Sequence, residues 1–200
     1  MSILCDNEIA DLANLGMITP FVPEQIKQVD TLNTVGLKRI SYGLSSYGYD
    51  LRLSPEEFFI YDVSVGRVVD PKRFDPQHLR QIDLHHNDNL DESYYILPPK
   101  TYGLGVTIER MIMPNYVTAI AIGKSTYARC GLIANLTPIE SGWRGHITLE
   151  LYNSSASPLR VYAYEGIAQL LFYRGAKCNV TYADRAGKYQ DQTHNVTFPT

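Results

Sequence analysis

The sequence has 200 residues, of which 44% are hydrophobic and 20% charged, a balance typical of globular proteins and not of disordered chains. Its net charge of −3 at pH 7 gives a poor overall field for nucleic acid, and no run approaches the roughly eighteen apolar residues of a membrane span. The cysteines Cys5, Cys130 and Cys178 are odd in number and far apart, and the first residues lack a signal-peptide pattern, so we expect a cytoplasmic protein that binds neither nucleic acid nor membrane.

The first thirty residues predict one helix and a connection. Asp6 is the expected N-cap of a helix that runs to Leu15, because apolar residues follow it at helical spacing. Gly16 is the expected stop. Beyond this point helical periodicity nearly vanishes.

Short apolar or alternating runs, separated by Gly, Pro, Asp and Asn, fill most of the remaining chain. They lie at residues 57–61, 94–97, 103–108, 117–122, 146–151, 159–162 and 168–173. Many short strands at spacings of about ten residues indicate a sandwich, a barrel or a jelly roll. We therefore expect one mainly β domain over residues 1–200, with an N-terminal helix.

Three segments between these runs call for separate interpretations. The Tyr- and Gly-rich residues 41–50 predict a packed corner in which tyrosine hydroxyls bond to the backbone, with a subunit interface as the alternative. Residues 70–92, rich in His, Asp and Pro, predict a long surface excursion. The tail after Gly187 is polar and aperiodic, and such tails are disordered unless a ligand or a neighbour ties them down.

The segment Gly123-Lys-Ser-Thr-Tyr-Ala-Arg-Cys-Gly131 is the densest candidate for binding chemistry. An apolar strand leads into it and a short helical turn is expected before Gly131, so backbone N–H groups beside Lys124 and Arg129 could hold an anion such as phosphate. A P-loop is excluded, because the Walker pattern needs a glycine at position 118, which is Thr118. An ordinary β-turn with exposed Lys and Ser fits the same residues.

A second candidate is the strand that contains Glu150. Period-2 alternation places Ile147, Leu149 and Leu151 on one face and Thr148 with Glu150 on the other. A glutamate here could simply face solvent. In a closed pocket, desolvation would favour proton uptake and make this carboxylate a usable proton shuttle.

Metal-dependent and serine-hydrolase chemistry find little support. The zinc deaminases use H-x-E and P-C-x-x-C motifs, whereas His146 is followed by Ile147 and Thr148 and no two cysteines are close. His85 and His86 are expected to form a solvated loop pair and not a metal site. No G-x-S-x-G elbow occurs. We expect neither zinc nor any other metal held by the protein.

Taken together, these segments resemble the dCTP deaminase family, which has a trimeric dUTPase-like β fold of the jelly-roll or distorted β-barrel kind. The likeness runs in order through residues 21–23, 45–50, 69–71, 123–131, 135–138, 145–150, 165–169 and 182–190, and so covers most of the chain. It implies an enzyme that hydrolyses dCTP to dUTP and ammonia in pyrimidine deoxynucleotide biosynthesis. It also implies a homotrimer with active sites between subunits, Mg²⁺ carried on the substrate triphosphate, and a tail, about 187–200, that closes over the ligand.

The resemblance also implies roles for individual residues. Glu150 matches the general base and acid, while Ser125 and Arg129 match residues that help to place the water and bind the substrate. The implied substrate-binding set comprises Lys124, Ser125, Thr126, Tyr127, Ala128, Arg129, Thr148, Leu149, Glu150, Gln169, Tyr182, Lys188 and Gln192.

Two departures from the family pattern keep rival functions open. Many relatives have Asp where this chain has Glu140, and some have Ala or Gly in place of Pro138. The longer Glu140 side chain puts dUTP hydrolysis in doubt, because it displaces the carboxylate by about one C–C bond. The chain also lacks the glycine-rich C-terminal motif of true dUTPases. The alternatives are a bifunctional deaminase and dUTP diphosphatase, and a non-catalytic nucleotide-binding trimer.

Overall fold

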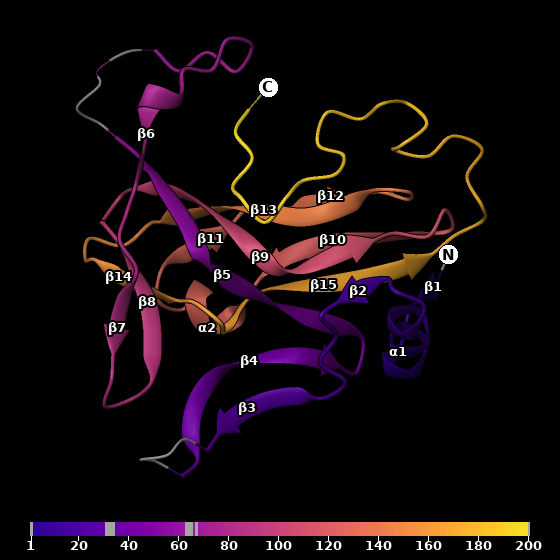
Figure 1. Cartoon of the computed structure of the whole chain (residues 1–200), viewed down its shortest axis with the longest axis horizontal. Helices are drawn as coiled ribbons and strands as arrows, with labels where there is room; N and C mark the ends of the chain where they lie inside the picture. The colour runs from indigo at the N-terminus through magenta and orange to yellow at the C-terminus, as the bar shows by residue number, and fades with distance from the viewer. Residues whose placement is uncertain (1, 31–34, 63–65, 67, 200) are drawn as a thin grey trace.

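The computed structural model describes residues 2–30, 35–62, 66 and 68–199, and strands dominate this part of the chain (Figure 1). The strands are β1 (Ser2–Ile3), β2 (Ile18–Thr19), β3 (Gln25–Val29), β4 (Leu37–Ser45), β5 (Gly48–Tyr61), β6 (Leu79–Gln81), β7 (His85–Asn87), β8 (Glu92–Leu97), β9 (Tyr102–Ile112), β10 (Val117–Gly123), β11 (Leu132–Ala134), β12 (Thr137–Ile139), β13 (Arg144–Asn153), β14 (Leu159–Tyr162) and β15 (Gly166–Arg174). The helices are α1 (Asp6–Asn14), the 3-10 turn η2 (Pro76–His78) and α2 (Ser125–Ala128).

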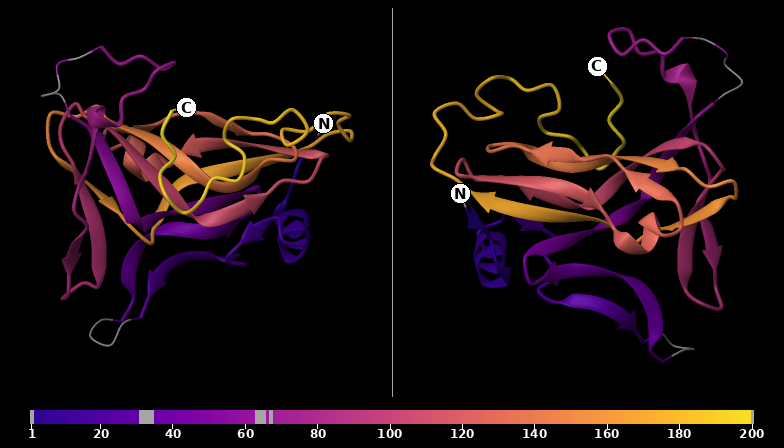
Figure 2. Two further views of the ribbon diagram at one scale, coloured as in Figure 1. Left: turned by 45° about the horizontal axis from the view of Figure 1, so that its top comes forward. Right: turned by 180° about the vertical axis from the view of Figure 1, so that it is seen from behind.

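One large antiparallel sheet follows the path β11-β13-β9-β5-β15-β10-β12. The two ends of this path, β11 and β12, are consecutive in the chain and are joined by residues 135 and 136 alone. The sheet must therefore curl until its ends approach each other, which gives a half-barrel (Figures 1 and 2). Irregularities in pairing accompany the curl, for example between His146 and Thr148 on β13.

Apolar side chains fill the inside of the curl. Phe58, Leu51, Leu151 and Phe172 are each fully buried, and they come from three of the long strands. Helix α1 adds Ile9 to the same core. In the second half of β13, alternation buries Leu149 and Leu151 in this core and turns Glu150 and Tyr152 outward, so the outer face can carry polar groups there.

Two smaller units project from the half-barrel. A second sheet of order β14-β8-β7 stands on one side, and the β3–β4 hairpin stands on another (Figure 1). No helix in the described part of the chain is long and apolar enough to cross a membrane.

The strand predictions are confirmed, since all seven predicted runs lie within strands β5, β8, β9, β10, β13, β14 and β15. The mainly β expectation with an N-terminal helix is confirmed with them. The stop at Gly16 is also confirmed, because this glycine has φ +95°.

The predicted N-cap of the first helix is wrong by one residue. Cys5 is the N-cap, and its backbone N–H donates to Glu8 Oε2 at 3.1 Å. Asp6 is the first residue of the helix, where a carboxylate still favours the positive end of the helix dipole.

The Tyr- and Gly-rich corner is a hairpin of β4 and β5. Within it Tyr49 is fully buried, and its hydroxyl accepts from Val22 N at 3.1 Å, as predicted for a packed tyrosine. Tyr47 is exposed at the turn.

The predicted surface excursion is partly wrong. It contains η2, β6 and β7, and His78 is buried against Phe74. His85 and His86 are exposed as expected, but they lie on strand β7 and not in a loop.

Candidate active site

A pocket of about 430 Å³ lies on the outer face of β9 and β13. Residues of the connection between β11 and β12 form one wall of this pocket, and residues of the C-terminal tail form another. Figure 2 shows the path of the tail along this side of the sheet. The described residues that line it are Tyr61, Tyr102, Leu104, Asn135, Leu136, Thr137, Pro138, Ile139, Glu140, Trp143, Ile147, Thr148, Glu150, Tyr182, Tyr189, Gln192, Thr197 and Pro199. The walls are mainly aromatic and apolar, with a small number of polar groups, as in most small-molecule sites.

Glu150 enters this pocket because of the alternation along β13. Leu149 and Leu151 are buried in the core, so the residue between them must face outward. The half-buried Glu150 accepts a hydrogen bond from Thr137 Oγ1 to Oε2 at 3.3 Å. Among the described residues the carboxylate has no cationic partner, so it can accept further hydrogen bonds from a molecule in the pocket.

Tyr102, which is on β9, lies beside the Glu150 carboxylate. Burial, with a smaller contribution from the negative charge of Glu150, raises the pKa of Tyr102. The phenol is therefore neutral near pH 7 and can donate a hydrogen bond. Its ring stacks on Tyr152, with centroids 6.0 Å apart.

The tail is ordered and completes the pocket. Gln192 Oε1 accepts from both the backbone N and Oγ1 of Thr148, each at 3.3 Å, and His146 N donates to Gln192 O at 3.0 Å. Trp143 Nε1 donates to Tyr189 O at 2.6 Å. The tail thus adds to the edge of the sheet beside Gly145, where the bridge to Gln192 is parallel.

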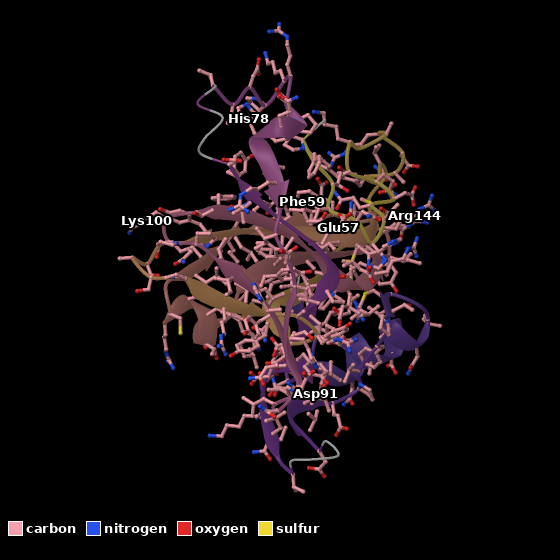
Figure 3. The ribbon with its side chains drawn as sticks, turned by 60° about the vertical axis from the view of Figure 1, so that its left-hand side comes forward. Glu57, Phe59, His78, Asp91, Lys100 and Arg144 are labelled. Atoms are coloured by element: carbon pink, nitrogen blue, oxygen red, sulfur yellow. The ribbon has the colours of Figure 1, made fainter. Side chains whose placement is uncertain are left out.

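The end of the tail is fixed by an acid on β5. Glu57 accepts from Asn195 Nδ2 at 2.7 Å and from Val196 N at 2.9 Å. Val196 is itself buried, and Phe198 packs edge-on against Phe59. Figure 3 labels Glu57 and Phe59 on β5, next to the tail.

A second carboxylate stands at the far wall of the pocket. Glu140 pairs with Arg185, whose guanidinium also lies over the ring of Tyr182 at 5.3 Å from the centroid. Tyr189 N donates to the Tyr182 hydroxyl at 2.9 Å. Glu140 is therefore neutralised by a neighbour, whereas Glu150 is not.

The segment that contains Ser125 and Arg129 lies away from the Glu150 pocket in the fold. It forms α2, which is found on one side of the curled sheet while the tail lies on the other (Figures 1 and 2). Ser125, Thr126, Ala128 and Arg129 are exposed, and none of them lines the Glu150 pocket.

Two members of this segment point into the fold. Tyr127 is buried, its hydroxyl accepts from Tyr162 N at 2.8 Å, and burial raises its pKa. Lys124 pairs with the buried Asp50, with Nζ 2.6 Å from Oδ2.

The implied substrate-binding residues thus fall into separate groups. Thr148, Glu150, Tyr182 and Gln192 meet in one pocket. Leu149 faces the core.

Gln169 and Lys188 lie outside that pocket. Gln169 pairs with Ile122 of β10 near α2, and its Nε2 donates to Ser45 Oγ at 3.3 Å. Lys188 is exposed on the tail. The binding roles of these residues stay predictions.

Several lining residues had no predicted role. The residues without a predicted role are Thr137, Trp143, Tyr189 and Thr197. Thr137 nevertheless belongs to the block 135–138, which carries part of the family likeness. That block was the one signal that could have found a partner for Glu150.

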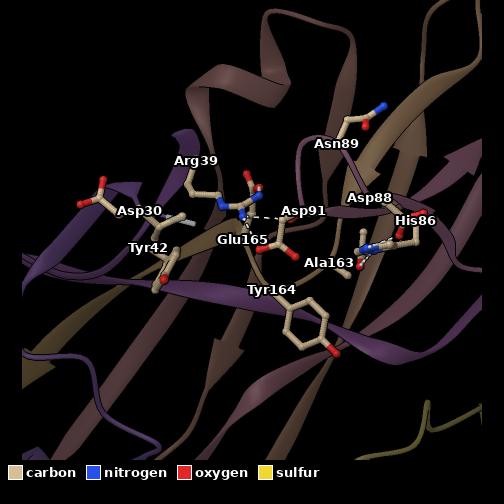
Figure 4. A pocket seen from close by; sticks show the side chains of 12 residues that line it. Asp30, Arg39, Tyr42, His86, Asp88, Asn89, Asp91, Ala163, Tyr164 and Glu165 are labelled. Carbon is tan, nitrogen blue, oxygen red and sulfur yellow. Dashed lines mark hydrogen bonds and ion pairs between the residues drawn. The ribbon is translucent and has the colours of Figure 1, made fainter. Parts of the chain in front are cut away.

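A larger cleft of about 1020 Å³ lies between the β3–β4 hairpin and the second sheet (Figure 4). It is lined by four carboxylates, one guanidinium and one imidazole, which belong to Asp30, Asp88, Asp91, Glu165, Arg39 and His86. Arg39 is already paired with Glu165 at 3.0 Å and Asp91 at 3.3 Å. A polyanion would meet excess negative charge here, so the smaller pocket is the better candidate for a nucleotide.

In the described part of the chain, no three His, Cys, Asp or Glu side chains are placed to hold an ion.

Comparison with known proteins points to one family. The family model described as dCTP deaminase-like matches residues 3–175. The chain is 47% identical over 203 residues to a protein of Xylella fastidiosa (strain M12) named dCTP deaminase, which covers 100% of this chain and 99% of that protein. A protein of the same name from Acinetobacter baylyi is 43% identical over 201 residues, with the same coverage.

A solved structure has the same fold. The 2′-deoxycytidine 5′-triphosphate deaminase from Agrobacterium tumefaciens superposes with a TM-score of 0.56 at 18% sequence identity. The match covers 86% of this chain and 48% of that chain, so this chain spans about half of that protein's length.

Proposed function

The chain belongs to the dCTP deaminase-like family, and we propose that it hydrolyses dCTP to dUTP and ammonia, with Glu150 as the proton carrier. The observation that carries this assignment of the site is the position of Glu150. Its carboxylate lies in a pocket with aromatic walls, has no cationic partner in the described chain, and is held by Thr137. We expect the reaction to draw on the soluble deoxynucleotide pool of the cytoplasm.

The chemistry needs one group that both takes up and releases a proton. Water adds to C4 of the cytosine ring while Glu150 accepts one of its protons. Glu150 passes that proton to N3, which completes the tetrahedral intermediate, and then takes the proton of the new C4 hydroxyl. As the C4=O bond forms and the bond from C4 to the amine breaks, Glu150 gives this second proton to the leaving amine, so that water and dCTP become ammonia and dUTP. General acid–base catalysis of this kind contributes about 10²–10⁴ in rate.

The aromatic walls and the tail supply the rest of the environment. Tyr182, Tyr189 and Gln192 would exclude bulk water and hold the nucleotide against Glu150. Water exclusion strengthens each charge and dipole that acts on the reacting ring.

We assign water activation to Glu150 and not to zinc. The described lining of the pocket contains neither His nor Cys, the residues that hold zinc in the zinc deaminases. Mg²⁺ would enter with the triphosphate and reduce its charge. A turnover assay with a zinc chelator and excess Mg²⁺ separates these roles, and loss of activity on zinc removal would refute this part of the proposal.

We also propose that Ser125 and Arg129 act on the Glu150 pocket of a neighbouring subunit. Within one chain they lie on the other side of the sheet from the tail, so a neighbour is needed to bring the two groups together.

An apolar groove on β10, β12 and β15 supports such an assembly, which we expect to be a homotrimer. Its lining is almost wholly apolar and includes Ile120, Leu136, Leu171 and Tyr173. Leu136 is 65% exposed in the isolated chain. An apolar surface of this kind is typical of a subunit interface.

The decisive experiment combines product analysis with one variant. Wild-type protein with dCTP and Mg²⁺ should release ammonia and dUTP in equal amounts. Glu150→Gln should lower kcat by about 10²–10⁴ and leave dCTP affinity within a few-fold, because the amide keeps the shape and loses the proton transfer. Glu140→Gln is the matched control in the same pocket, and it should retain far more of kcat.

The same products separate the rival functions. A bifunctional enzyme would convert dCTP to dUMP and pyrophosphate without accumulating dUTP. A non-catalytic binding protein would release no ammonia. Glu140 is paired with Arg185 and is not free to position a water for phosphate hydrolysis, which favours deamination alone.

A further inference from the structure

Lys124 directly precedes the turn that presents Ser125 and Arg129, yet its side chain is inside the fold. Its Nζ lies 2.6 Å from Asp50 Oδ2, and the two side chains are only 11% and 2% exposed. Asp50 lies in the middle of the sheet, opposite Gly43 of β4 on one side and Gln169 of β15 on the other.

Asp50 depends on this lysine. Its Oδ2 also accepts from Gln25 Nε2 at 3.1 Å, but Gln25 is neutral. Its Oδ1 is buried and has no hydrogen-bond partner among the residues that the structure describes. A buried carboxylate requires a nearby cation, and Lys124 is the cation paired with it in the described chain. If the ammonium left to meet a phosphate, Asp50 would stay behind as an unpaired buried charge.

The aliphatic part of the Lys124 side chain packs where two strands approach each other closely. A Cβ added at Gly166, the first residue of β15, would lie 1.9 Å from Ser41 O and 3.1 Å from Lys124 Cε. The backbone of β15 therefore approaches β4 with no side chain between them, and the lysine stem packs beside this contact.

Anchoring the side chain also fixes the start of α2. Lys124 is the N-cap residue, with an extended backbone at φ −80° and ψ 133°. Its carbonyl accepts from Ala128 N at 3.0 Å, and the carbonyl of Ser125 accepts from Arg129 N at 3.1 Å. The orientation of the whole turn thus follows from where Lys124 is held.

We propose, building on the function proposed above, that Asp50 and Lys124 form a positioning pair. Asp50 holds the Lys124 ammonium inside the fold, and Lys124 fixes the turn that presents Ser125 and Arg129. The cationic side chain that this segment offers to the triphosphate is therefore Arg129 and not Lys124.

A double-mutant cycle tests the pair. The variants are Asp50→Asn, Lys124→Met and the two combined, with Lys177→Met as an exposed-lysine control. The readouts are kcat/KM for dCTP, thermal unfolding, and the inhibition constant of inorganic triphosphate, which reports on the phosphate site alone. Breaking a buried ion pair from one side is costly, whereas replacing both partners by neutral groups is often nearly neutral.

The expected result is rescue. Each single variant should lower kcat/KM by roughly 10–100-fold, and the double variant should return to within about five-fold of wild type. For the double variant, the inhibition constant of inorganic triphosphate should differ from the wild-type value by less than about three-fold. A double variant as poor as Lys124→Met, with a tenfold weaker inhibition by triphosphate, would show that the lysine binds phosphate and would overturn the proposal.

If the variants do not fold, a measurement on protein that keeps both Lys124 and Asp50 still tests the pair. The ¹⁵N signal of the Lys124 ammonium, assigned by its loss in Lys124→Met or by exclusion, should be protected from exchange and should not move when inorganic triphosphate is added. A large shift on addition would refute the pair. Absence of dCTP turnover in wild-type protein would overturn the proposed function, and this NMR result would still decide the fate of the pair.

Discussion

Replacing Glu57 by alanine should weaken the docking of the C-terminal tail without changing the groups that carry out the reaction. Glu57 is on β5 and is not among the described residues that line the pocket. Its carboxylate accepts from Asn195 Nδ2 and from Val196 N, so Glu57→Ala removes both hydrogen bonds at once. The tail keeps its other contacts, including the burial of Val196.

The size of the effect follows from the two bonds. A hydrogen bond to a charged group contributes about 1.5–3 kcal/mol, and the lower end applies because Glu57 is only half-buried. Two such bonds give about 3 kcal/mol, which lowers the ratio of docked to free tail by about 150-fold. Since apparent affinity scales with the docked fraction, KM for dCTP should rise by about 10- to 100-fold.

Steady-state kinetics with dCTP provide the assay. At saturating substrate kcat should fall by less than about three-fold, because bound nucleotide restores the docked tail. The neighbour Glu56 is exposed and makes no hydrogen bond to the described residues of the tail, so Glu56→Ala is a matched control that should leave KM unchanged. Equal effects of the two substitutions, or a loss confined to kcat, would refute this account of the tail.

Three further predictions concern the tail and the assembly. Gly145→Ala should raise KM by roughly tenfold in the dCTP assay, because φ is +142° and a Cβ would lie 2.7 Å from Gln192 N; an unchanged KM would contradict this contact. Leu136→Asp should convert the expected trimer to monomers in light scattering and abolish turnover, whereas an intact trimer would exclude this groove as the interface. A hydrogen bond from Arg144 lowers the pKa of Asp191, so the stability from this pair is complete at neutral pH and is lost as pH falls through the lowered pKa, below about 4. The difference in thermal stability between wild type and Asp191→Asn should be full at pH 7 and should narrow as the pH is lowered below about 4, and a difference that does not narrow in acid would contradict the assignment.

The parts of the fold with regular alternation could be predicted from the sequence. β13 is the clearest case, because its apolar residues alternate with Thr148 and Glu150, and the structure places both in the pocket. β3 gave no such signal. Its apolar residues Ile26 and Val29 are three positions apart and so do not alternate. In the structure this spacing is accommodated by an irregularity in the pairing with β4 between Ile26 and Gln28.

The candidate site could be predicted only in part, because its partners are distant in sequence. Nothing near Lys124 in the chain shows that Asp50, 74 residues away, holds its ammonium. The tail has the composition of a disordered segment, yet backbone hydrogen bonds and the burial of Val196 hold it down. Such contacts depend on tertiary structure and leave no periodicity to read.

The small apolar cluster under the tail couples two surface segments. Val196 shares this cluster with Leu79 of β6, and Phe74 and Phe198 pack against it. When the tail lifts, apolar area on both segments becomes hydrated, so residues 74–79 contribute to the energy barrier for opening although none of them is among the described residues that line the Glu150 pocket. Changes there should therefore alter how long the product stays bound, and the excursion before β6 becomes a place where turnover could be tuned without any change to the reacting groups.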